Sequence, residues 1–164
     1  MKIICACILC IFMLAGCSQP KTYETMSDVY YEAKKTAAYT ITFAVPEEAA
    51  VTVMENEENG TIYLCDGYCI MAQTMEAGDL DATLRSITGY PRDKLRIIRR
   101  EQDHTARYEC AWASTGEGGD QVGRTAVLDD GDYHYTLSVM AQADAAGELT
   151  EIWQEIFDTL SIVP

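Results

Sequence analysis

The stretch that decides the fold is Tyr133–Ala141 (YHYTLSVMA), followed after a short interval by Leu149–Leu160 (LTEIWQEIFDTL). The first segment is rich in aromatic and β-branched residues, which favour a strand. The second carries apolar residues at the i, i+3, i+4, i+7 spacing of a helix with one buried face. These residues are Leu149, Ile152, Trp153, Ile156, Phe157 and Leu160. The pattern predicts a C-terminal amphipathic helix that packs on a sheet.

Upstream of this segment, tight-turn signals join further strands into hairpins. Asp66-Gly67 lies between Thr61–Cys65 and Tyr68–Thr74, and Asp129–Asp132 (DDGD) precedes Tyr133. Asp-Gly between two such segments is a strong hairpin signal. The remaining predicted strands are 39–45, 51–54, 95–100, 105–114 and 123–128. Strands joined by tight turns form antiparallel sheets.

A second, shorter helix is expected at 78–89, because Asp79 can cap its first turn and Gly89 can end it. The sequence therefore predicts an α+β fold. Its parts are a mainly antiparallel sheet of about six or seven strands, this short helix, and the C-terminal amphipathic helix packed on the sheet.

Composition narrows the classes of function. The chain has 164 residues, which leaves room for one domain. Its formal net charge of −14 makes nucleic acid an unfavourable partner, because phosphate binding needs clustered Lys and Arg. No nucleophile-elbow, zinc-protease or phosphate-loop motif occurs. The sequence therefore assigns no catalytic residue, no cofactor and no metal site.

The first seventeen residues have the parts of an export signal. Met1-Lys2 is positive, Ile3–Leu14 is uninterrupted and apolar, and small residues precede Cys17. The segment Leu14–Cys17 (LAGC) resembles the lipobox of bacterial lipoproteins. The resemblance implies cleavage between Gly16 and Cys17 and attachment of a diacylglycerol to the Cys17 thiol. The alternatives are an uncleaved anchor and an ordinary signal peptide with a chance cysteine.

This processing divides the chain into three parts. Residues 1–16 are the expected signal peptide, 17–36 a lipidated tether with a weakly ordered arm, and 37–164 a single α+β globular domain. A short polar, Pro-containing segment follows Cys17, as is typical of a tether. We expect the domain outside the cytoplasm, anchored to the bacterial cell membrane by the lipid on Cys17.

Three cysteines lie in the expected domain. A three-residue loop would place Cys65 and Cys69 opposite each other for a possible disulfide, whereas a two-residue loop would make that bridge diagonal and strained. Free thiols are the alternative. Cys110 is expected to be a buried, unreactive thiol, and a catalytic alternative pairs it with His134.

Three polar segments are candidate surfaces. The Asp129–Asp132 turn is expected to carry solvated carboxylates, with a ligand or metal carrier as the alternative. The glycine-rich segment 116–120 is expected to be a mobile loop. A basic cluster either offsets nearby acids or forms a patch for a partner. Its members are Arg92, Lys94, Arg96, Arg99 and Arg100.

The strand Tyr133–Val139 running into the helix 149–160, together with Pro46-Glu47-Glu48-Ala49, resembles the PsbP-like group of small α+β domains. The chain is also similar to small lipoproteins of Gram-positive bacteria. PsbP-like domains are mostly extrinsic accessory or scaffold proteins, so the resemblance implies docking more than catalysis. An envelope protein is the expected partner. We therefore expect a membrane-anchored, non-catalytic accessory or binding module of the cell envelope. The alternatives are a small extracytoplasmic enzyme using Cys110 and His134 or paired carboxylates, and a ligand or metal carrier.

Overall fold

A curved antiparallel sheet with one helix on each face forms the centre of the computed structural model, which describes residues 34–53, 60–102, 104–116 and 118–164. Lys34–Pro164 is one compact unit. The expected signal peptide, its cleavage site at Gly16 and the lipidation site Cys17 lie outside the described residues. Among the described helices, none is long and apolar enough to span a bilayer.

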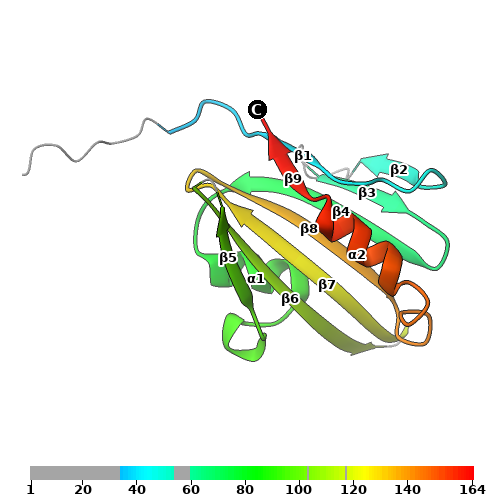
Figure 1. Ribbon diagram of the computed structural model, residues 1–164. Coiled ribbons are helices and arrows are strands. Elements are labelled where there is room, and N and C mark those ends of the chain that lie inside the picture. The colour runs from blue at the N-terminus through cyan, green and yellow to red at the C-terminus, as the bar shows by residue number, and fades with distance from the viewer. Residues whose placement is uncertain (1–33, 54–59, 103, 117) are drawn as a thin grey trace, which may run out of the picture. The chain divides into compact units, whose positions relative to one another are not determined.

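The main sheet has seven strands in the order β2-β3-β4-β8-β7-β6-β5, and every neighbouring pair is antiparallel (Figure 1). Its strands are β2 (Ala50–Val53), β3 (Gly60–Leu64), β4 (Tyr68–Glu76), β5 (Ile98–Gln102), β6 (Thr105–Gly116), β7 (Gly119–Asp129) and β8 (Tyr133–Gln142). The predicted fold class is therefore confirmed. The sequence between 105 and 141, which carries strong strand signals, forms the long strands β6, β7 and β8.

A separate two-stranded sheet pairs β1 (Thr40–Thr42) with β9 (Ser161–Val163). The sequence predicted a strand at β1 but none at β9, because three residues at the end of a helix carry no periodicity. The pair brings the beginning and the end of the described domain side by side (Figure 1).

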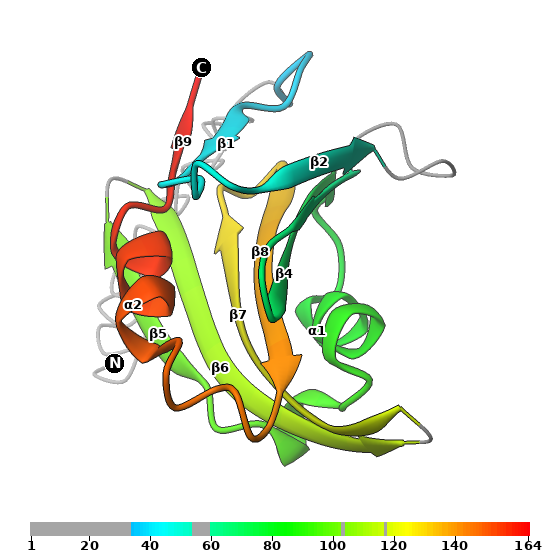
Figure 2. The same ribbon diagram turned by 90° about the vertical axis from the view of Figure 1, so that its right-hand side faces the viewer.

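Both predicted helices are present. Helix α1 (Leu80–Thr88) begins at Asp79, whose carboxylate accepts a hydrogen bond from the Asp81 N–H at 3.0 Å, and ends at Gly89 with φ of 77°. Helix α2 (Thr150–Asp158) buries Trp153, Ile156 and Phe157. A 3-10 helix, η1 (Arg92–Lys94), follows α1. Figure 2 shows α1 and α2 on opposite faces of the main sheet.

The two faces of the main sheet carry separate cores. On the α2 face, Ile70, Leu137 and Val139 pack with α2 and with apolar side chains of β1 and β9. On the α1 face, a smaller core consists of Leu84, Cys110 and Val127. The two faces use alternate residues of the same strands, as the period-2 geometry of strands requires.

Segment 116–120 differs from its prediction as a mobile loop. Strands β6 and β7 continue to the hairpin tip, where Gly116 pairs with Gly119. The glycines that suggested a loop instead serve the turn, since Gly119 has φ of 97°, a conformation that glycine adopts without steric cost.

Candidate ligand-binding site

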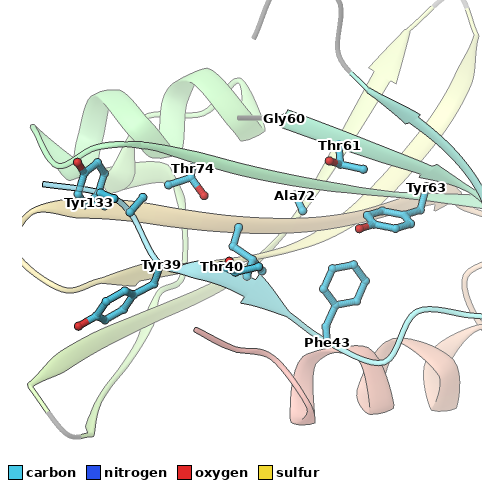
Figure 3. A pocket seen from close by; sticks show the side chains of 12 residues that line it. Tyr39, Thr40, Phe43, Gly60, Thr61, Tyr63, Ala72, Thr74 and Tyr133 are labelled. Carbon is cyan, nitrogen blue, oxygen red and sulfur yellow. The ribbon is translucent and has the colours of Figure 1, made fainter. Parts of the chain in front are cut away.

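A cavity of about 670 Å³ lies on the α2 face, where β1 crosses over β3 and β4. Figure 3 shows its lining from close by. The residues come from the segment around β1 and from β3, β4 and β8. They are Ala37, Ala38, Tyr39, Thr40, Ile41, Phe43, Gly60, Thr61, Tyr63, Ala72, Thr74 and Tyr133. The β1 strand therefore forms one wall and the main sheet the other.

Aromatic rings stand at both ends of this cavity. Phe43 and Tyr63 meet edge to face at one end, with ring centroids 5.3 Å apart and an interplanar angle of 83°. Tyr39 and Tyr133 lie at the other end, with small and hydroxyl-bearing residues between (Figure 3). The described lining residues include no Asp, Glu, Lys, Arg, His or Cys. The cavity is therefore suited to binding an uncharged ligand through ring faces and hydroxyl groups.

Hydrogen bonds to side chains hold the β1 wall in place. The Tyr39 N–H donates to the Tyr135 hydroxyl at 3.0 Å, and the Ala44 N–H donates to the Thr159 hydroxyl at 2.8 Å. The hydroxyls of Thr42 and Ser161 are 2.7 Å apart. These contacts provide hydrogen-bond partners for backbone and side-chain groups that the short β1–β9 pairing does not bond.

Asp130 is the charged group that fixes the segment leading into this wall. Its side chain is only 4% exposed, so the prediction of a solvated carboxylate was wrong for this residue. One carboxylate oxygen accepts hydrogen bonds from the Lys35 ammonium at 2.7 Å and the Tyr135 hydroxyl at 2.8 Å. The other accepts from the N–H groups of Asp132 and Tyr133.

These contacts set the protonation of the group. Burial by itself would raise the pKa of Asp130, but the hydrogen bonds from Lys35, Tyr133 and Tyr135 outweigh it, and the pKa lies below its ordinary value. The same partnership raises the pKa of Lys35. The Lys35 ammonium also lies 4.2 Å from the centroid of the Tyr39 ring. The Lys35–Asp130 ion pair therefore helps to position Tyr39, which lines the cavity.

Cys110 and His134 do not form a catalytic pair. Both lie on the α1 face, but the register separates them by two strands and four residues, roughly 16 Å. Burial raises the pKa of the Cys110 thiol to about 11. The His134 Nδ1 atom instead lies 2.8 Å from the Thr83 hydroxyl, and Nε2 is 3.7 Å from Asp129. His134 is only 1% exposed, so it serves packing between α1 and the sheet.

Cys65 and Cys69 are free thiols in the structure. The Cys65 N–H donates to the Tyr68 carbonyl at 3.0 Å, which closes a two-residue turn. A turn of this length would make a Cys65–Cys69 disulfide diagonal and strained. Cys65 packs on the α2 core, whereas Cys69 follows Tyr68 on the other face. Burial raises the pKa of both thiols.

The basic cluster of 92–100 is divided among several contacts. Arg99 pairs with Glu101 at 2.7 Å, and Arg100 lies 3.7 Å from Glu109. Glu109 is buried and also accepts from Arg107 at 2.8 Å and Arg124 at 2.6 Å. Burial would raise the pKa of Glu109, but the two arginines hold it below its ordinary value. For Arg99 and Arg100, the structure supports the role of offsetting acids.

Carboxylates of the described residues do not converge on a metal. No group of three or more His, Cys, Asp or Glu side chains among them could hold an ion. In the Asp129–Asp132 turn, the Asp129 and Asp130 carboxylates accept hydrogen bonds from backbone N–H groups. This arrangement is that of a hairpin turn, as the favoured interpretation of the sequence had it.

The cavity residues carry no joint signal in the sequence. Tyr39, Phe43 and Tyr63 are separated along the chain, and no local motif joins them. The one available signal was the strand alternation of 39–45, which puts Tyr39, Ile41 and Phe43 on one face. The partner of that face depends on the β1–β9 pairing, which the sequence did not predict.

No family model matches the chain, and no curated protein matches it. Solved structures do share its fold. LpqN of Mycobacterium tuberculosis, described as involved in cell envelope biogenesis, has a TM-score of 0.52 at 13% identity, over 79% of this chain and 87% of that chain. The cyanobacterial PsbP protein (CyanoP) of Synechocystis sp. PCC 6803 has a TM-score of 0.55 at 8% identity, over 79% of this chain and 95% of that chain. At these identities the likeness concerns the fold, which is PsbP-like.

Proposed function

We propose that this protein is a lipid-anchored, non-catalytic binding module of the cell envelope, and that its ligand is an uncharged saccharide held in the aromatic cavity. The observation that carries the proposal is the cavity itself. It is large enough for a small ligand, lined by rings and hydroxyls, and free of charged groups among its described lining residues.

The chemistry of the lining favours a sugar over an ionic ligand. The aromatic rings of Phe43, Tyr63 and Tyr133 offer apolar contact to a sugar ring, and threonine hydroxyls on β1, β3 and β4 can exchange hydrogen bonds with its hydroxyl groups. An anionic ligand would leave its charge without a cation among these residues, which is costly. Saccharides are abundant in the cell envelope, the compartment to which the export signal directs the chain.

The setting in the envelope rests on two observations. The LAGC segment ending at Cys17 resembles a lipobox, and the fold is shared with LpqN, which is described as involved in cell envelope biogenesis. We infer from them an extracytoplasmic domain held at the membrane by lipid on Cys17, with an envelope protein as a further partner. A signal peptide covering residues 1–16 is part of the same proposal.

Ligand binding is tested by titrating the full chain with a panel of neutral envelope oligosaccharides in a calorimeter. We expect Phe43→Ala and Tyr63→Ala each to weaken binding by about tenfold or more, because a stacked ring is lost. Ile152→Ala is the matched control, since Ile152 is exposed and does not line this cavity. Equal affinity in all three variants, or binding of charged glycans only, would contradict the proposal.

Anchoring is tested by the mass of the protein purified from cells. We expect an N-terminus at Cys17 and the added mass of a diacylglycerol, and Cys17→Ser should leave an unlipidated chain. An intact Met1 with no lipid would overturn the anchor. The ligand titration of the cavity does not depend on the outcome of this anchoring test. Crosslinking in cells, followed by identification of the joined peptides, tests for an envelope protein partner.

A further inference from the structure

Three sulfur-containing residues occupy neighbouring positions on the α1 face, where β4 begins and β8 ends. Cys69 lies directly opposite Met140, and Met71 lies opposite Ser138, the residue two positions before Met140. Alternation along each strand puts all three on the same face. Opposite residues on one face have Cβ atoms about 4.5–5.5 Å apart, and diagonal neighbours are within reach of long side chains. One thiol and two thioethers can therefore meet at a common point.

These side chains lie outside the two buried cores, and on β3 Ile62 is opposite Met71 and Leu64 is opposite Cys69. Neither the α2 core nor the α1 core includes Cys69, Met71 or Met140, and none packs at their margins. All three are half-buried. Helix α1 makes its contacts further along the face, with Cys110 and Val127 through Leu84 and with His134 through Thr83. Methionine usually fills gaps in a core, so two of them at an accessible position call for another explanation.

An indole ring borders the cluster. Gly123 on β7 lies opposite Met140, and Trp112 on β6 lies opposite Gly123. The Trp112 ring covers Gly123 so closely that a Cβ atom there would be 2.3 Å from the ring. Its Nε1–H donates to the Thr125 hydroxyl at 3.0 Å, and that hydroxyl is 2.8 Å from the Ser138 hydroxyl. The anchored indole thus covers Gly123, the residue opposite Met140.

We propose that Cys69, Met71 and Met140 bind a soft monovalent cation, Cu(I), next to the Trp112 indole. Thiolate and thioether sulfurs select Cu(I) over the hard divalent cations, which prefer oxygen. An aromatic face adjacent to a cation adds an attraction of its own. Binding forms a Cu–S bond to Cys69 and releases the thiol proton to solvent, and the oxidation state of copper does not change. The site uses residues that the saccharide cavity on the other face does not.

The first test is a competition for Cu(I) between the full chain and the chromogenic chelator bicinchoninate under anaerobic, reducing conditions. We expect Cys69→Ser and the double variant Met71→Leu Met140→Leu each to lower the affinity by about tenfold or more, since changes of metal-site partners cost at least that much. Leucine conserves the volume of methionine, so the double variant keeps its fold. Melting curves by circular dichroism verify this.

Matched controls separate this site from other sulfur. Cys65→Ala removes the neighbouring thiol, which packs on the opposite face, and Met75→Leu removes a methionine of the same strand that instead contacts Thr83. Both should bind Cu(I) as the wild type does. The proposal is overturned if the chain does not compete with the chelator, if the Met71→Leu Met140→Leu variant binds normally, or if Cys65→Ala loses binding.

A second readout uses the indole and the redox-inert analogue Ag(I). In a Trp153→Phe background the fluorescence comes from Trp112, because the chain has two tryptophans. We expect saturable quenching by one equivalent of Ag(I), and no quenching when Met71→Leu and Met140→Leu are added. Quenching that persists in those variants would place the cation elsewhere and overturn the site.

Discussion

The two faces of the main sheet use the same strands for different purposes. The α2 face buries a large apolar core and the ring-lined cavity, with Phe157 and Ile70 fully buried. The α1 face buries hydroxyls and a histidine: Thr125, His134, Thr136 and Ser138. One nine-residue helix covers that face, and it brings a single fully buried leucine, Leu84.

This difference indicates where the stability of the domain resides. Burying a large apolar side chain contributes about 1.5–3 kcal/mol, whereas a buried hydrogen bond contributes about 1 kcal/mol net. The α2 face should therefore dominate the free energy of unfolding. The buried polar residues of the α1 face orient α1 on the sheet but add less to the free energy of unfolding. The sulfur-containing residues of this face are therefore available for the proposed metal site.

The largest expected effect is on the α2 face. Phe157→Ala should lower the free energy of unfolding by about 4 kcal/mol, because it leaves a cavity in place of a fully buried ring. It also removes the aromatic partner of Arg124, whose guanidinium lies 4.3 Å from the ring centroid. Chemical denaturation measures it. Ile152→Ala, on the same helix but 39% exposed, should cost far less. Equal losses would mean that α2 does not close the core.

The second largest effect is expected at the Lys35–Asp130 ion pair, at the edge of the α2 face. Asp130→Asn should cost about 3 kcal/mol at neutral pH, since it leaves the Lys35 ammonium without its buried partner. The pKa of Asp130 is lowered in the folded state, so the advantage of the wild type is full above the ordinary value of 3.8 and declines as the pH falls below it. Denaturation at a series of pH values measures this. Asp144→Asn, at an exposed position, should show neither effect.

A smaller loss is expected on the α1 face from Gly123→Ala. The added methyl group would be 2.3 Å from the Trp112 ring, so the indole must shift, at a cost of about 2 kcal/mol. In the Trp153→Phe background, thermal unfolding and the emission maximum of Trp112 report the change. Gly78→Ala meets no atom within 4 Å and provides the control. An unchanged emission spectrum in Gly123→Ala would show that the ring is not anchored there.

The smallest effect is expected at the hydrogen bond between Thr83 and His134 on the α1 face. Thr83→Val removes the hydroxyl that lies 2.8 Å from His134 Nδ1 and should cost about 1 kcal/mol. The amide exchange rates of α1 should rise more than those of β8, because the helix loses its polar attachment to the sheet. A loss as large as that of Phe157→Ala would reverse the ranking of the two faces.

Local signals allowed much of this fold to be predicted. The caps at Asp79 and Gly89 depend on residues within a few positions of one another, and the structure confirms them. On the predicted apolar face of α2, Trp153, Ile156 and Phe157 are buried, whereas Ile152 is 39% exposed. The cavity could not be predicted in the same way. Phe43 and Tyr63 meet only because β1 pairs with β9 across more than a hundred residues. Burial of Asp130 likewise depends on Lys35, at a separation of 95 residues.

The arrangement of contacts ahead of β1 has a mechanical consequence. A tensile load applied to the chain before Lys34 would meet the Lys34–Glu76 and Lys35–Asp130 pairs first, then the Tyr39–Tyr135 hydrogen bond, and then the three residue pairs of β1 and β9. These contacts would break one after another before the strands of the main sheet separate. Pulling on the protein would therefore open the cavity wall and release its contents well before the domain unfolds.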